Sequence, residues 1–130
     1  MMAALPPVPP DGHLWRRVPD LHWVDDGAGG LRPSSAAFED DPEGSPMSTI
    51  LAEESTLSRA FAPVRSHPRA FALACFPVAA AAERGLRAER DPTPDEPAHV
   101  LVLGSKTKSV RSALGRASVW AWPPPGQPYP

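Results

Sequence analysis

The sequence has a single cysteine, which excludes an intrachain disulfide. Cys75 stands in the apolar segment FALACF, where we expect a buried thiol. Long hydrophobic runs are also missing. The run FALACFPVAAAA is twelve residues long and contains Pro77, whereas a membrane-spanning helix needs about 18 residues or more. No basic region precedes an apolar stretch at the N-terminus. These absences predict a cytoplasmic protein with no membrane partner.

Clustered metal ligands and known catalytic motifs are lacking as well. No two of the four histidines have helical i, i+3 or i, i+4 spacing, so the sequence predicts no zinc site. The acidic segment FEDDPEG lacks the alternating aspartates and the terminal glutamate of a calcium loop. GSPMS lacks the G-x-S-x-G turn of many serine hydrolases, because proline follows the serine. We therefore expect no metal and no cofactor.

Acidic residues are absent from Val100 to the C-terminus, although this segment carries Lys106, Lys108, Arg111 and Arg116. Residues 39–54 have the opposite composition, with six acidic residues and no basic one. Two interpretations fit this asymmetry: the two segments face each other in the fold, or the basic segment holds an anion. The net charge of −2 argues against general affinity for polyanions, so we expect no nucleic-acid partner.

Proline is abundant instead, at 19 of 130 residues, and it is concentrated at the two ends. Proline donates no backbone hydrogen bond, so Pro-rich ends fit extended chain better than helix or sheet. We predict disordered Pro-rich tails at 1–12 and 123–130 and a single domain at 13–122. The domain has four Trp and four Phe as its largest apolar side chains, which suffice for one modest core.

Apolar patterning predicts a strand followed by a helix near the C-terminus. Val100–Leu103 is a short continuous apolar run, which favours a strand buried on both faces. Over 106–118, apolar residues recur at i, i+3, i+4 and i+7, which predicts a helix. A second pair is predicted at FALACF, with a helix that starts at Pro77 and stops at Gly85. One helix over 70–84, kinked at Pro77, is the alternative.

The remaining elements are expected to be short. They comprise two extended pieces over 13–24, a turn at DDGAGG, a strand or helix start at MSTIL, a helix over 55–61, and a last edge strand at VWAW. Trp120 and Trp122 of VWAW either belong to the core or form an exposed aromatic patch for a partner. The overall expectation is an α+β fold, a small single domain with a few short strands packed on two or three helices.

The segment LGSKTKSVRSAL is the strongest candidate for a binding site. A helix N-terminus presents unpaired backbone amides to an anion, and nearby lysines and hydroxyls would add charge and donors. The spacing does not match the Walker motif GxxxxGK[ST]. A purely structural interpretation also fits: Gly104 turns the chain, a hydroxyl caps the helix and the lysines are solvated. The ligand-binding candidates in this segment are Ser105, Lys106, Thr107 and Lys108.

A second part of the candidate site comes from RPSS and from the strand start at His99. Arg32, Ser34 and Ser35 offer a guanidinium and two hydroxyls to a phosphate or carboxylate. His99 is the candidate catalytic residue, as a base at a strand end. The sequence alone does not bring these segments together, and a polar surface histidine is the alternative interpretation.

The sequence leaves two functions open. RPSSAAF, PMS and PAHVLVLG resemble segments of short bacterial proteins, a resemblance that implies no activity. The first hypothesis is a small cytoplasmic accessory or adaptor protein that acts through protein–protein contacts. The alternative is a phosphate- or nucleotide-binding protein or enzyme with an anion site at the start of the last helix. We accordingly expect a protein partner or a small phosphorylated ligand.

Overall fold

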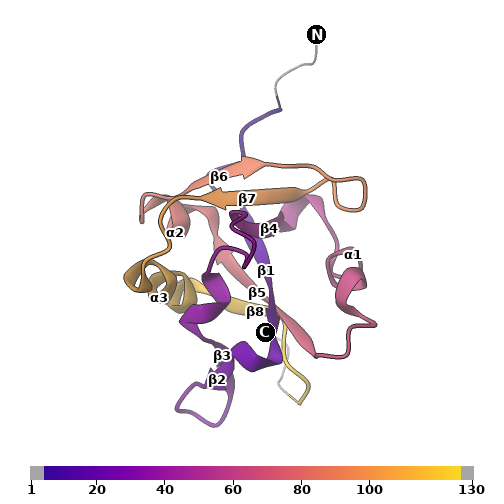
Figure 1. The fold of residues 1–130 in the computed structure, drawn as a ribbon, viewed down its shortest axis with the longest axis vertical. Helices are drawn as coiled ribbons and strands as arrows, with labels where there is room; N and C mark the ends of the chain where they lie inside the picture. Colours follow the sequence, from indigo (N-terminus) through magenta and orange to yellow (C-terminus); the bar gives the residue numbers. More distant parts are fainter. Residues whose placement is uncertain (1–4, 127–130) are drawn as a thin grey trace.

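The computed structural model describes residues 5–126, and its centre is one antiparallel sheet (Figure 1). Six strands form this sheet in the order β6-β7-β4-β1-β5-β8. Strands β2 (Trp23–Asp25) and β3 (Leu31–Pro33) pair separately as a hairpin. The strands of the large sheet are β1 (His13–Pro19), β4 (Met47–Leu51), β5 (Phe71–Pro77), β6 (Arg87–Arg90), β7 (His99–Leu103) and β8 (Val119–Trp122).

The helices are few and short. The α-helices are α1 (Leu57–Phe61), α2 (Val78–Ala82) and α3 (Lys108–Ala117), and the 3₁₀ turns are η1 (Asp20–His22), η2 (Ser35–Phe38), η3 (Ala52–Glu54) and η4 (Ala62–Val64). Together they hold only about 27% of the described residues.

The expected α+β fold, with a few short strands packed on two or three helices, is therefore wrong. The sheet contains more strand residues than expected for two reasons. Strand β1 pairs with β5 over its whole length, from His13↔Pro77 to Pro19↔Phe71, because Pro19 stands at the strand end and interrupts nothing. In addition, the charged segment RAER forms the edge strand β6 against β7. Apolar patterning does not reveal such a strand, because three of its four residues are charged and Ala88 is its one apolar residue.

Several local predictions are confirmed. Strand β7 covers the predicted apolar run, α3 lies within the predicted 106–118 helix, and MSTIL is strand β4. FALACF is the strand β5, and α2 starts directly after Pro77, so the kinked-helix alternative is wrong. Burial on both faces of β7 is also wrong: Val100 and Val102 are fully buried, but Leu101 and Leu103 are half-buried. This alternation is typical of an antiparallel strand with one covered face.

The core lies between the sheet and the segments that carry η2 and α3. Leu14 and Val18 of β1 are buried there together with Phe38 of η2 and Leu114 of α3. Phe38 meets Phe76 of β5 edge to face, with ring centroids 5.9 Å apart, a geometry that aromatic pairs favour. η2 and α3 are thus held against one another by buried apolar side chains, and this packing positions the site described below.

The opposite face of the sheet is partly covered by α1. Arg17 of β1 donates from Nε to the Ala60 carbonyl oxygen at 2.7 Å, and Phe61 stacks on Trp122 of β8 at 4.7 Å. Figure 1 shows α1 on the opposite side of the molecule from α2 and α3. Cys75 of β5 is half-buried, whereas we expected full burial. Removal from solvent raises the pKa of its thiol.

The ends of the described chain contact the domain. Val8 packs against the core, and Arg90 donates from Nε to the Pro6 carbonyl oxygen at 2.8 Å. Residues 1–4 and 127–130 of the predicted tails lie outside the described residues. Within 5–126, no helix has the length and apolar character needed to traverse a bilayer.

Candidate functional site

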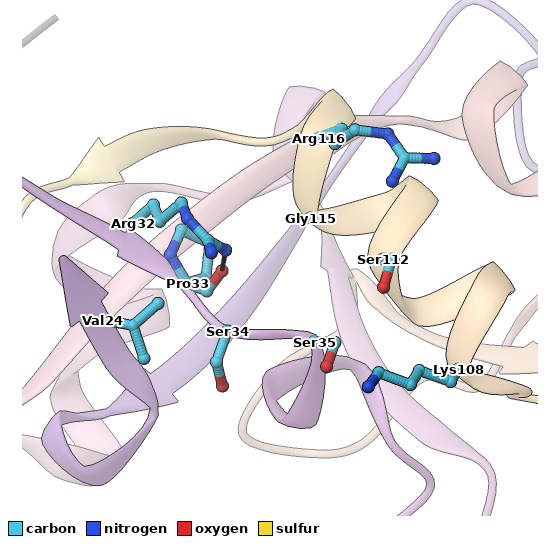
Figure 2. Close-up of a pocket in the computed structure, with 9 residues that line it drawn as sticks. All are labelled: Val24, Arg32, Pro33, Ser34, Ser35, Lys108, Ser112, Gly115 and Arg116. Carbon is cyan, nitrogen blue, oxygen red and sulfur yellow. Dashed lines mark hydrogen bonds between the residues drawn. The ribbon is translucent and has the colours of Figure 1, made fainter. Parts of the chain in front are cut away.

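A pocket of about 520 Å³ lies between α3 and the chain that leads from β2 through β3 into η2 (Figure 2). One wall is a face of α3, and the other is the β3–η2 segment. The residues that line it are Val24, Arg32, Pro33, Ser34, Ser35, Lys108, Ser112, Gly115 and Arg116.

Helical periodicity explains why residues of α3 form one wall of the pocket. Lys108, Ser112, Gly115 and Arg116 are spaced i, i+4, i+7 and i+8, so they share one face of α3. Ala113 and Leu114 are buried in the core on the other side of the helix. The helix begins at Thr107, whose side chain accepts a hydrogen bond from the Val110 backbone N–H. The pocket is therefore lined by the side of the helix rather than by its N-terminal amides.

Hydrogen bonds and buried side chains place the other wall. The Ser34 backbone N–H donates to the His22 carbonyl oxygen at 2.8 Å, and the Trp120 indole donates to the Leu31 carbonyl oxygen at 2.9 Å. Ala37 and Phe38 anchor η2 in the core. Arg32, Ser34 and Ser35 project from a segment that is fixed at both ends.

The acidic segment at 39–41 neutralises part of the basic α3 region. Lys106 Nζ lies 2.8 Å from Asp40 Oδ1, and Arg111 Nη1 lies 3.0 Å from Glu39 Oε1. The neighbouring Asp41 pairs with Arg16 of β1 at 3.5 Å. The prediction that the acidic and basic segments face each other is confirmed by these contacts.

The basic side chains of the pocket lack such partners. Among residues 5–126, Lys108 and Arg116 make no ion pair, and Arg32 makes none either. The guanidinium of Arg32 has only a long contact, 3.5 Å, from Nη1 to the Pro33 carbonyl oxygen. Within the described part of the chain, no aspartate or glutamate lines the pocket. Three cations and three serine hydroxyls thus surround one cavity without an internal counter-ion.

The structure brings together some of the candidate residues and separates others. Arg32, Ser34, Ser35 and Lys108 line the same pocket, although they come from segments far apart in the sequence. Ser105, Lys106 and Thr107 do not line it. The Lys106 ammonium is nearly buried, with 4% of its side chain exposed, and contacts the carbonyl oxygens of Val102 and Gly104 as well as Asp40.

His99 lies away from this pocket, on strand β7. Its Nδ1 is 3.0 Å from the Asp91 carbonyl oxygen and 3.1 Å from Asp91 Oδ2. It borders a separate small cavity of about 50 Å³ beside Trp15 and Ile50. His99 and the phosphate-binding candidates therefore do not share a site.

Sequence reasoning missed Ser112 and Arg116 as members of the site. The signal was available, since these residues follow Lys108 by four and eight positions and so share its helical face. The anion hypothesis places the ligand at the helix start, and neither Ser112 nor Arg116 lies there. Gly115, seven positions after Lys108, had the same signal, whereas Val24 had none, because the contact between the β2–β3 hairpin and α3 is a property of the tertiary fold.

Comparisons with protein-family models, with curated proteins and with solved structures find no match to this chain.

Proposed function

We propose that this protein binds a small phosphorylated or similarly anionic ligand in the pocket between α3 and the β3–η2 segment. The observation that carries the proposal is the set of basic side chains, Arg32, Lys108 and Arg116, in a cavity whose lining, within residues 5–126, contains no carboxylate. Charged hydrogen bonds from such groups to an oxyanion are worth about 1.5–3 kcal/mol each. The proposed site of action is the cytoplasm, where phosphorylated metabolites are abundant.

The rest of the pocket suits the same ligand class. Ser34, Ser35 and Ser112 add hydroxyl donors to the cations. The volume of about 520 Å³ lies within the usual range for small-molecule pockets, about 300–1,000 Å³. The lining includes no histidine, aspartate or glutamate to exchange protons. These features support a binding protein better than an acid–base enzyme.

Ligand-dependent stabilisation tests the proposal. Melting temperatures are measured with sodium phosphate, pyrophosphate and AMP against sodium chloride at matched ionic strength. A ligand at 100 times its Kd stabilises the folded state by about 2.7 kcal/mol, so a clear rise in Tm is expected for at least one phosphate compound. The triple variant Arg32→Gln/Lys108→Gln/Arg116→Gln should lose this rise.

Arg65→Gln is the matched control for loss of a positive charge. Arg65 is exposed, follows η4 and does not line the pocket. Its variant should keep the full response to phosphate. An equal response in the triple variant, or no response in the wild type, would contradict the proposal.

The adaptor hypothesis remains a second proposal, and one observation favours it. Strand β8 is at the edge of the large sheet, and Val119 on it is 60% exposed. Edge strands with exposed apolar residues can pair with a strand of another protein. The test is affinity capture from a bacterial lysate with wild type and Val119→Lys in parallel. A specific protein captured by the wild type and lost with Val119→Lys supports this proposal, and identical captures contradict it.

A further inference from the structure

We infer that the pocket is built for a ligand with two anionic groups at opposite ends of a polar body, as in a sugar bisphosphate. This inference rests on the proposed function and specifies its ligand class. It is carried by how the cations are distributed along the pocket.

The two cations of α3 stand at opposite ends of the pocket wall. Lys108 and Arg116 are eight residues apart on one helix, which corresponds to a rise of about 12 Å along the axis. In Figure 2 the Lys108 ammonium is directed toward Ser35, whereas Arg116 stands at the other end of the helix. A compact anion such as one phosphate group would neutralise one end and leave the other without a counter-ion.

The polar side chains of the β3–η2 wall are also divided between two ends of the pocket. Arg32 lies on the β3 side of the pocket and Ser35 lies at the start of η2. Figure 2 shows Ser35 near Lys108 and Arg32 at a distance from both. In the same view the Arg116 guanidinium is directed away from Arg32. One anionic group is therefore assigned to Lys108 and Ser35, and the second to Arg32.

Between its two ends the pocket is lined by uncharged residues, both apolar and hydroxyl-bearing. Ser34 and Ser112 supply hydroxyls there, and Gly115 leaves the helix surface free of a side chain. An added Cβ at Gly115 would meet Phe38 at 3.7 Å and the Pro33 carbonyl oxygen at 3.8 Å, which are ordinary van der Waals contacts. Hydroxyl groups on a ligand body would find donors and acceptors here.

Calorimetric titration at low salt tests the inference with fructose 1,6-bisphosphate, fructose 6-phosphate and pyrophosphate. Fructose 6-phosphate has the same sugar with one phosphate, and pyrophosphate has two adjacent phosphates with no spacer. We expect the bisphosphate to bind at least about tenfold more tightly than either, because one more charged contact is worth a tenfold change or more.

The variants Lys108→Gln and Arg32→Gln assign the two ends. Each should reduce bisphosphate affinity to about that of fructose 6-phosphate, and Arg65→Gln should leave the preference unchanged. Near-native far-UV circular dichroism of the variants checks that the fold is kept.

The outcomes separate this inference from the proposed function. If pyrophosphate or fructose 6-phosphate binds as tightly as the bisphosphate, the two-ended assignment is overturned while anion binding stands. If all three phosphate compounds fail to bind, or bind equally to the triple variant, both the assignment and the proposed function are overturned.

Discussion

Helix α3 and the turn before it carry basic residues in two different settings. On the side of the acidic segment, Lys106 and Arg111 each contact a carboxylate, on Asp40 and Glu39 respectively. On the pocket side, Lys108 and Arg116 contact no carboxylate among the described residues. Basic residues that lie close together in the sequence thus form two groups, one with carboxylate partners and one without.

The difference shows which charges stabilise the fold and which are free to bind a ligand. The Lys106 ammonium has three oxygen partners, each at 2.8 Å, and is shielded from solvent. It closes the turn between β7 and α3 and ties that turn to the acidic segment. Lys108 is exposed, so its charge contributes little to folding. The pocket cations are thus available to a ligand.

The largest expected effect is the loss of the buried ammonium. Lys106→Met should destabilise the protein by about 2–3 kcal/mol, because Asp40 and two carbonyl oxygens lose their donor. Lys108→Met makes the same change of side chain on the pocket side and should alter stability by no more than about 0.5 kcal/mol. Urea unfolding of both variants measures the contrast. Similar losses in the two variants would contradict the division of these cations into those with a carboxylate partner and those without one.

The next contrast compares two glycines: Gly104 precedes α3, and Gly115 lies inside it. Gly104 has φ +122°, and an added Cβ would lie 2.7 Å from Leu86 Cδ2. Leu86 can shift, but the backbone conformation remains unfavourable, so Gly104→Ala should cost about 1–3 kcal/mol.

Gly115→Ala should have the opposite sign. Gly115 is inside α3, and its nearest neighbours would be 3.7 Å or more from the new Cβ. Replacing a helical glycine with alanine typically stabilises by about 0.5–1 kcal/mol. Thermal unfolding of both glycine variants measures whether each change raises or lowers the stability. A loss of stability in Gly115→Ala would show that the pocket wall is packed more tightly than the distances of 3.7 Å and above indicate.

Local patterning predicted much of the secondary structure but not the sheet. The 3.6-residue period of α3 and the apolar run of β7 are properties of adjacent residues, and both were recognised. The pairing of β1 with β4 and β5 joins residues more than 30 positions apart, and a single sequence carries no record of such register. This is why the fold class was predicted with too few strands.

The residues of the candidate site could likewise be predicted only in part. Arg32, Ser34, Ser35 and Lys108 were selected for their chemistry, and the fold places them in one pocket. Lys106 was selected by the same reasoning, yet its ammonium is directed to Asp40. Residue type alone did not distinguish the two lysines, because the distinction depends on which side of the turn the acidic segment packs.

A smaller effect is expected from the exposed ion pair of Arg111. The Glu39 side chain is 56% exposed, and exposed ion pairs contribute about 0–1 kcal/mol. Glu39→Gln should therefore destabilise by less than about 1 kcal/mol at low salt, and the difference from wild type should shrink at 1 M NaCl because of screening. Urea unfolding at both salt concentrations checks this. A cost equal to that of Lys106→Met would contradict the ranking.

The smallest expected effect concerns Arg32, whose charge acts on Asp26 in the β2–β3 loop. The pKa of Asp26 is lowered first by the backbone N–H donors of Ala28 and Gly30, and Arg32 adds the weakest of the contributions. Arg32→Gln should therefore raise the pKa of Asp26 only slightly. A depressed carboxyl pKa supports the folded state above the unfolded pKa, and this support is lost as the pH falls.

An NMR titration of the Asp26 carboxyl carbon in wild type and Arg32→Gln measures the coupling directly. Asp26 Oδ1 accepts hydrogen bonds from Ala28 at 2.7 Å and Gly30 at 3.0 Å, and neither bond involves the arginine. These bonds alone should keep most of the pKa depression in the variant. Complete return of the pKa to its ordinary value would show that Asp26 is the counter-ion of Arg32. The pocket would then have only the two cations of α3, and the contrast between paired and unpaired charges would be confined to the helix.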